Sequence, residues 1–185
     1  MPLSDAQPRT RLHTRTITLE GFQREDGLFD IEAEITDRKT HGFSTIDRAV
    51  EPGTPLHHMN VRVTVNNELE IVGAEAQTTH GPFTICSGGA ASFSRLIGLT
   101  IRPGFLKSAN ERLGGTSGCT HIRELLQQLG TVAMQTFYPI RAKLQPRAPD
   151  APPRLLNTCH AYASDGPVIQ RSDPAYYTGP ATPKA

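Results

Sequence analysis

Apolar and polar residues alternate along two stretches near the N-terminus, and this alternation predicts β-strands. In the segment 28–36 (LFDIEAEIT), the apolar side chains at positions 29, 31, 33 and 35 share one face and the carboxylates at 30, 32 and 34 share the other. The run 15–20 (RTITLE) alternates in the same way, and Glu25-Asp26-Gly27 between the two runs is a turn signal. The two runs therefore predict a hairpin.

A second hairpin is predicted by the segment 61–65 (VRVTV) and a returning strand over 68–78. Asn66-Asn67 between them is typical of a tight turn. Short helices are predicted over 90–99 and 103–113, and both follow the strands in the sequence.

The long helix of the chain is predicted to begin after Ser117, a good N-cap residue, and to end before Pro139. On a helical wheel Cys119 then points inward and His121 points outward. If the helix begins one residue later, His121 turns toward Cys119.

Strands that come first and helices that follow predict an α+β fold. We expect an antiparallel sheet of two hairpins with helices packed on one face. Residues 1–11 are predicted to be disordered, residues 12–144 to form a single α+β domain, and residues 145–185 to form a proline-rich linker and C-terminal tail.

Composition removes several function classes. The formal net charge of the 185-residue chain is +1, so no general attraction to nucleic acid or to an anionic membrane is expected. The apolar runs are too short for a membrane span, and the N-terminus lacks a secretory signal, so a cytoplasmic location is expected. A small-molecule substrate is the expected partner, and a homo-oligomer is compatible with the sequence.

The cysteines are the main candidates for chemistry. Cys119 lies where the long helix begins, and unpaired amides and the helix dipole favour its thiolate form there. Cys86 follows a strand in a loop that contains proline and glycine, an ordinary place for a ligand. Either thiol has a structural alternative as a small buried side chain. Three cysteines that are widely separated fit reduced thiols better than a disulfide framework.

Histidines and carboxylates supply further candidates. His57 and His58 precede a strand, and adjacent residues on an extended segment point to opposite sides, so at most one should face the site. Cys159-His160 could supply a fourth ligand or contact a substrate. Asp30 and Glu32 are candidates for acid–base chemistry, with Arg24 as a partner or as a contact for an anionic substrate, although such a row of carboxylates is more often a solvated face.

Three motifs resemble those of an uncharacterised bacterial family that is known as a domain of unknown function. The motifs are GFxRxDGLxDIE (21–32), PLHxM (55–59) and GGTxGCTH (114–121). The resemblance covers roughly residues 12–140 and implies no activity. His58 stands where we associate an acidic residue with the family.

The layout of residues 53–137 also resembles the U-type iron–sulfur cluster scaffold proteins. Gly53-x-Pro55-x-His57 precedes a hairpin, Cys86 follows it, and Cys119 opens the long helix. The resemblance implies a scaffold-like fold and a zinc or iron–sulfur site at His57, Cys86 and Cys119. His57 replaces a scaffold cysteine and Met59 replaces its aspartate, which weakens a cluster-donating role.

The sequence thus predicts a small enzyme that depends on Zn or Fe, of hydrolase or lyase type, acting on a small organic metabolite. Its metal ligands would be His57, Cys86 and Cys119, with Cys159 as the fourth. Alternatives are an iron–sulfur scaffold or carrier, a metal-free binding module with structural thiols, and a metal-free enzyme with Cys119 as nucleophile.

Overall fold

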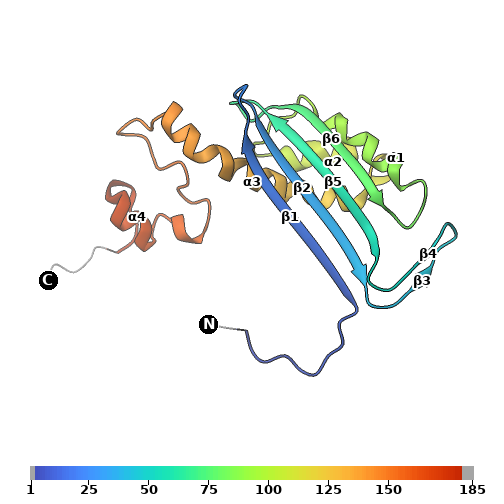
Figure 1. The fold of residues 1–185 in the computed structure, drawn as a ribbon. Helices are drawn as coiled ribbons and strands as arrows, with labels where there is room; N and C mark the ends of the chain where they lie inside the picture. Colours follow the sequence, from blue (N-terminus) through green and yellow to red (C-terminus); the bar gives the residue numbers. More distant parts are fainter. Residues whose placement is uncertain (1–2, 181–185) are drawn as a thin grey trace. The chain divides into compact units, whose positions relative to one another are not determined.

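The computed structural model describes residues 3–180, and its centre is one four-stranded antiparallel sheet in the order β1-β2-β5-β6. Both predicted hairpins are present (Figure 1). Three of their four strands are longer than predicted, and the returning strand of the second hairpin spans 71–80 in place of the predicted 68–78. Residues 3–12 contain no helix or strand, and residues 1–2 of the predicted disordered segment lie outside the described part. The strands are β1 (His13–Gln23), β2 (Phe29–Lys39), β5 (Pro55–Val65) and β6 (Ile71–His80).

Within the 3–140 part of the chain, the helices that follow the strands lie on one face of this sheet, as Figure 1 shows. The predicted α+β fold with helices on one face is therefore confirmed. Between β2 and β5 the chain forms a small separate hairpin of β3 (Phe43–Ser44) and β4 (Ala49–Val50). The helical elements are α1 (Cys86–Ala91), η1 (Ser92–Leu96), α2 (Phe105–Leu113), η2 (Gly115–Ser117) and α3 (Thr120–Leu144).

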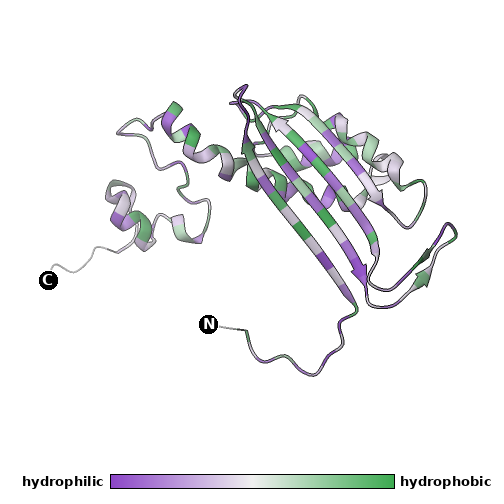
Figure 2. Cartoon of the chain, in the orientation of Figure 1, coloured by the Kyte–Doolittle hydropathy of each residue, from purple (hydrophilic) through white to green (hydrophobic). Residues whose placement is uncertain are grey.

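The core lies between the sheet and these helices, because each strand turns its apolar side chains inward. Ile35 of β2 and Met59 of β5 are direct cross-strand partners, and both are fully buried. Ile17 of β1 pairs with Ile35 on the same face. The hydropathy colouring shows the alternation along the strands (Figure 2). The opposite face of the sheet is polar and, in the 3–140 part of the chain, is not covered by a helix.

Helix α3 packs along the sheet and continues through Pro139 to Leu144. The prediction that Pro139 ends the helix is wrong. A proline inside a helix removes one hydrogen bond and crowds the preceding turn, but Phe137 is buried before it and Ile140 packs against the core after it. Near this end α3 approaches β1 so closely that a Cβ at Gly21 would lie 1.8 Å from Thr136 Oγ1.

The chain divides into two compact units, Met1–Ile140 and Arg141–Ala185. The second unit contains η3 (His160–Tyr162), α4 (Pro167–Ser172) and η4 (Pro174–Tyr176). Within it Ile169 is fully buried, and Arg147 forms an ion pair of 2.7 Å with Asp173. The last five residues of the predicted tail lie outside the described part. Between residues 3 and 180 no helix has the length and apolar character needed to cross a membrane.

Candidate metal centre

The inward face of the sheet ends in a polar row. On β2 the buried apolar residues at every second position, up to Ile35, are followed by Asp37, whose exposed fraction is 0%. Asp37 is the direct cross-strand partner of Arg15 on β1 and of His57 on β5. Because cross-strand partners share a face, these three polar side chains continue the layer that is apolar elsewhere.

Both oxygens of Asp37 accept hydrogen bonds. Arg15 donates from Nε to Oδ1 and from Nη2 to Oδ2, each at 2.8 Å. His13 Nε2 lies 2.9 Å from Oδ1, and His57 Nδ1 lies 3.0 Å from Oδ2. Burial alone would raise the pKa of the Asp37 carboxyl, but the bonds from Arg15, His13 and His57 outweigh burial and hold that pKa well below its usual range. The carboxylate of Asp37 therefore stays ionised, and both of its oxygens already accept hydrogen bonds from neighbouring side chains.

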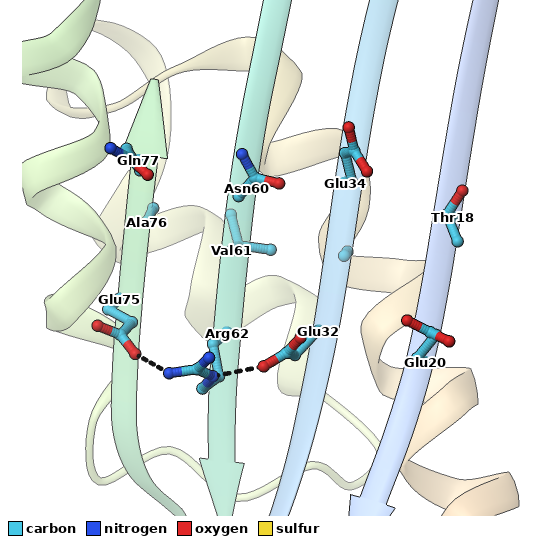
Figure 3. Close-up of a pocket in the computed structure, with 11 residues that line it drawn as sticks. Thr18, Glu20, Glu32, Glu34, Asn60, Val61, Arg62, Glu75, Ala76 and Gln77 are labelled. Carbon is cyan, nitrogen blue, oxygen red and sulfur yellow. Dashed lines mark hydrogen bonds and ion pairs between the residues drawn. The ribbon is translucent and has the colours of Figure 1, made fainter. Parts of the chain in front are cut away.

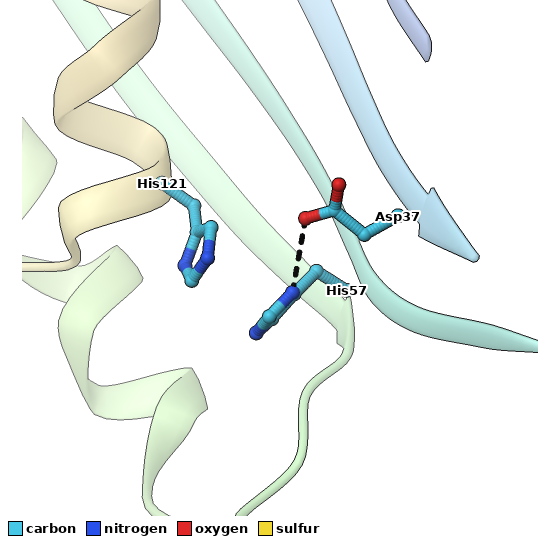
Figure 4. A group of neighbouring side chains, drawn as sticks. All are labelled: Asp37, His57 and His121. Carbon is cyan, nitrogen blue, oxygen red and sulfur yellow. Dashed lines mark hydrogen bonds and ion pairs between the residues drawn. The ribbon is translucent and has the colours of Figure 1, made fainter. Parts of the chain in front are cut away.

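His121, near the start of α3, lies beside His57 with its ring tilted against that of His57 (Figure 4). The centroids of the two imidazole rings are 3.8 Å apart and the ring planes are inclined by 33°. Asp37, His57 and His121 each place one potential ligand atom within 4.8 Å of the others. His121 Nδ1 also lies 3.8 Å from Cys119 Sγ. A carboxylate, two imidazoles and a thiol thus meet at one end of the core.

Both imidazoles are held in their neutral form near neutral pH. Burial lowers the pKa of His57, and the neighbouring His121 lowers it further against the opposing effect of Asp37. Burial also lowers the pKa of His121, followed by the positive charge of Arg15. A neutral imidazole keeps a lone pair on one nitrogen, which is what metal binding or proton abstraction requires. His57 contacts the carboxylate through Nδ1, so its tautomer with hydrogen on Nδ1 leaves Nε2 as that free nitrogen.

The position of His121 depends on where α3 begins. The residues before it form η2 and an extended Gly118, and α3 starts at Thr120. The prediction that His121 points outward is therefore wrong: the helix starts two residues later than a cap at Ser117 implies, and His121 lies beside Cys119. His121 is half-buried, in keeping with this inward position.

The predicted cysteine ligands are only partly brought together. Cys86 is the first residue of α1, and Gly89 of the same helix packs on Cys119: a Cβ at Gly89 would lie 3.0 Å from Cys119 Cβ. Within residues 3–180, however, no group of three or more potential ligands within 4.8 Å of one another includes a cysteine, and Cys119 approaches His121 alone. Cys159 belongs to the second unit and is exposed.

The predicted catalytic residues Arg24, Asp30 and Glu32 lie elsewhere. Asp30 and Glu32 are on the outer face of β2, so the sheet separates them from His57. There Arg24 pairs with Asp26 at 2.6 Å and with Asp30 at 3.6 Å. Glu32 binds Arg62 at 2.7 Å and lines a polar hollow of about 430 Å³ (Figure 3). The structure does not bring these three residues to the histidines.

Sequence reasoning missed Asp37, Arg15 and His13. One signal was available, because the alternation of β2 continues past Thr36 and places Asp37 on the apolar face. His13 and Arg15 likewise share the parity of the apolar residues of β1.

The metal-free protein is expected to lose stability as the pH falls from 7.5 to 5.5. The pKa values of His57 and His121 lie below the ordinary 6.5 in the folded state. The unfolded chain therefore takes up protons first, so the stabilisation is complete above pH 6.5 and is lost as the pH falls through the lower folded values. Urea denaturation at several pH values with a chelator present measures the free energy of unfolding. In the double variant His57→Asn/His121→Asn, the free energy of unfolding should depend less on pH. If it fell with pH as steeply as in the wild type, these two histidines would not be the cause of the pH dependence.

The fold and this cluster define an α+β protein with a candidate metal centre at the end of its core. The sequence model of the family described as "Protein of unknown function (DUF2889)" matches residues 13–135, and the chain belongs to this family, so the expected membership of an uncharacterised family is confirmed. The matched segment contains Asp37, His57, Cys119 and His121. No curated protein and no solved structure matches the chain, so the resemblance to iron–sulfur scaffolds stays an expectation.

Proposed function

We propose that this chain is a metal-dependent enzyme of hydrolase or lyase type that acts on a small organic molecule. One Zn²⁺ or Fe²⁺ ion would be held between β5 and the start of α3 by His57, His121 and Cys119. The observation that carries the proposal is the contact between two neutral imidazoles beside a buried carboxylate: their ring centroids are 3.8 Å apart, and the three groups each place a ligand atom within 4.8 Å of the others. Neutral imidazole is the commonest protein ligand for such metals.

The choice of Cys119 as third ligand rests on its distance from His121; the ligand atoms of His57, His121 and Cys119 do not all lie within 4.8 Å of one another, so binding would require a side chain to move toward the ion. With zinc bonds of about 2.3 Å to sulfur and 2.05 Å to nitrogen, a tetrahedral site separates these two atoms by about 3.6 Å. The observed separation of Cys119 Sγ and His121 Nδ1 is 3.8 Å. Nitrogen and sulfur ligands together suit zinc, and three protein ligands leave a fourth position for water or substrate.

Asp37 is better suited to orient a ligand than to be one. Its oxygens already accept bonds from His13, Arg15 and His57, and direct coordination would require some of these to break. A carboxylate that holds Nδ1 of a histidine directs Nε2 toward the ion and raises its basicity. The row Arg15–Asp37–His57 therefore supports His57 as a preformed ligand.

A metal at this position would lower the pKa of a bound water toward neutrality or polarise a carbonyl group. Because Asp30 and Glu32 lie on the other face of the sheet, the protein groups near the reacting atoms would be His57, His121 and Cys119. They would hold the ion while burial at the end of the core limits access of bulk water.

A second candidate function is a metal-free enzyme with Cys119 as nucleophile. The 3.8 Å approach of His121 Nδ1 to Cys119 Sγ favours it, because an imidazole beside a thiol can accept its proton. Iodoacetamide labelling of Cys119 at pH 6 and pH 8.5 separates the two functions. A nucleophilic thiolate reacts at both values in metal-free protein, and zinc should protect the thiol if it is a ligand.

Elemental analysis of the purified protein tests the leading proposal. We expect about one equivalent of zinc or iron per chain, retained in Cys86→Ser and lost in Cys119→Ser. The first variant is the matched control, because Cys86 is also half-buried and lies on the helix that packs against Cys119. A brown protein after anaerobic reconstitution, whose colour disappears in Cys86→Ser, would instead support the iron–sulfur scaffold. Less than about a tenth of an equivalent that does not rise on reconstitution would contradict both metal hypotheses.

A further inference from the structure

An apolar groove, separate from the histidines, lies between α2 and α3 on the helical layer. Its volume is about 430 Å³, and its walls come from residues 101–107 and from one side of α3. Leu106 and Met134 stand at its rim with exposed fractions of 38% and 39%. This volume lies within the range of small-molecule pockets, which are mostly apolar with a few polar groups that fix orientation.

The charged residues that line the groove are all positive. Arg102 and Lys107 line it, and no acidic residue does. Within residues 3–180, neither Arg102 nor Lys107 forms an ion pair. An apolar trough with two unpaired cations is complementary to a molecule with an alkyl chain and an anionic head group.

A glycine in the middle of α3, Gly130, lines the groove. A glycine inside a helix is unfavourable relative to alanine. A Cβ at this position would lie 3.7 Å from Ile101 Cγ2 and 3.9 Å from Phe105 Cδ1, which are ordinary contact distances. Packing therefore does not demand glycine here, and Gly130 leaves the floor of the groove without a side chain.

We propose that this groove binds a free medium-chain carboxylate. Its alkyl chain would lie over Gly130 between Leu106 and Met134, and its carboxylate would lie near Arg102 and Lys107. This proposal stands on the groove alone and does not depend on the metal centre.

Isothermal titration calorimetry of the full chain with dodecanoate, below its critical micelle concentration, tests the proposal. We expect saturable binding that is about tenfold weaker for dodecyltrimethylammonium, which has the same chain and the opposite charge. The variant Arg102→Gln/Lys107→Gln should weaken dodecanoate binding by about tenfold, from the loss of two partly exposed ion pairs. Arg9→Gln/Arg95→Gln removes the same charge from exposed positions outside the groove and should bind like the wild type.

A carboxylate placed in the groove gives an independent test. Thr131 is exposed and lines the groove, so Thr131→Glu should fold and should repel dodecanoate, whereas Ser87→Glu adds the same charge at an exposed site on α1 and should not. Equal affinity for the two amphiphiles, or wild-type affinity in Thr131→Glu, would overturn the proposal. Protein that fails to bind dodecanoate but sediments with phosphatidylglycerol vesicles would overturn it in favour of a membrane surface.

Discussion

His57→Ala is expected to weaken zinc binding by at least about 100-fold, while His58→Ala leaves it unchanged, although the two residues are adjacent. Their side chains lie on opposite faces of β5. His57 faces Asp37 and His121 on the inner side, and His58 binds Glu34 at 2.7 Å on the outer side. Removing His57 takes away a ligand and the group that Asp37 orients. Competition with a chromophoric zinc chelator measures the dissociation constant of each variant.

His58→Ala is a close control, because it deletes the same chemical group one residue away in the same strand. Circular dichroism and the urea midpoint establish that both variants are folded before affinities are compared. If the two variants lost zinc to the same extent, or if neither lost it, the site would not be the one at His57 and His121.

Asp37→Ala is expected to destabilise the metal-free protein by about 3 kcal/mol, which is a large fraction of the stability of an ordinary domain. The carboxylate is fully buried, and its removal leaves Arg15, His13 and His57 without the acceptor they share. The expected loss lies at the lower end of the range for broken buried ion pairs because the side chain of Arg15 is 31% exposed and also contacts Glu124.

Glu124→Gln supplies the comparison, since it removes the other partner of Arg15 at an exposed position and should cost less than about 1 kcal/mol. Urea denaturation at pH 7.5 with a chelator present gives both free energies without a contribution from bound metal. Equal losses in the two variants would mean that Asp37 is not the centre of the polar row.

The sheet could be predicted from the sequence because the alternation of apolar and polar residues that marks each strand lies within that strand. Alternation over 28–36 marks the inner and outer faces of β2, and the burial of Phe29 and Ile35 follows it. The helical layer could be predicted from apolar spacing, as at Leu126 and Leu129 of α3. Local signals failed at Pro139, where packing of the neighbouring residues prevails over the preference of proline to end a helix.

The site was harder to predict because it depends on pairing across the chain and on the exact turn of one helix. In the sequence, Asp37 resembles an ordinary polar residue at the end of a strand. Its burial depends on a hydrogen bond from Arg15, which lies 22 positions earlier. His121 depends on the helix start, and a shift of one residue rotates a side chain by about 100°. His57 was identified through the resemblance to iron–sulfur scaffolds, whereas the row Arg15–Asp37–His57 required the strand register.

X-ray absorption spectroscopy at the zinc edge, on the protein loaded with one equivalent, tests the proposed centre most directly. The proposal predicts two imidazole nitrogens at about 2.0–2.1 Å, one sulfur at about 2.3 Å and one further light atom. The sulfur contribution should vanish in Cys119→Ser and persist in Cys86→Ser. A spectrum without imidazole scattering, or one with two or more sulfurs per zinc, would contradict a site built from His57, His121 and Cys119.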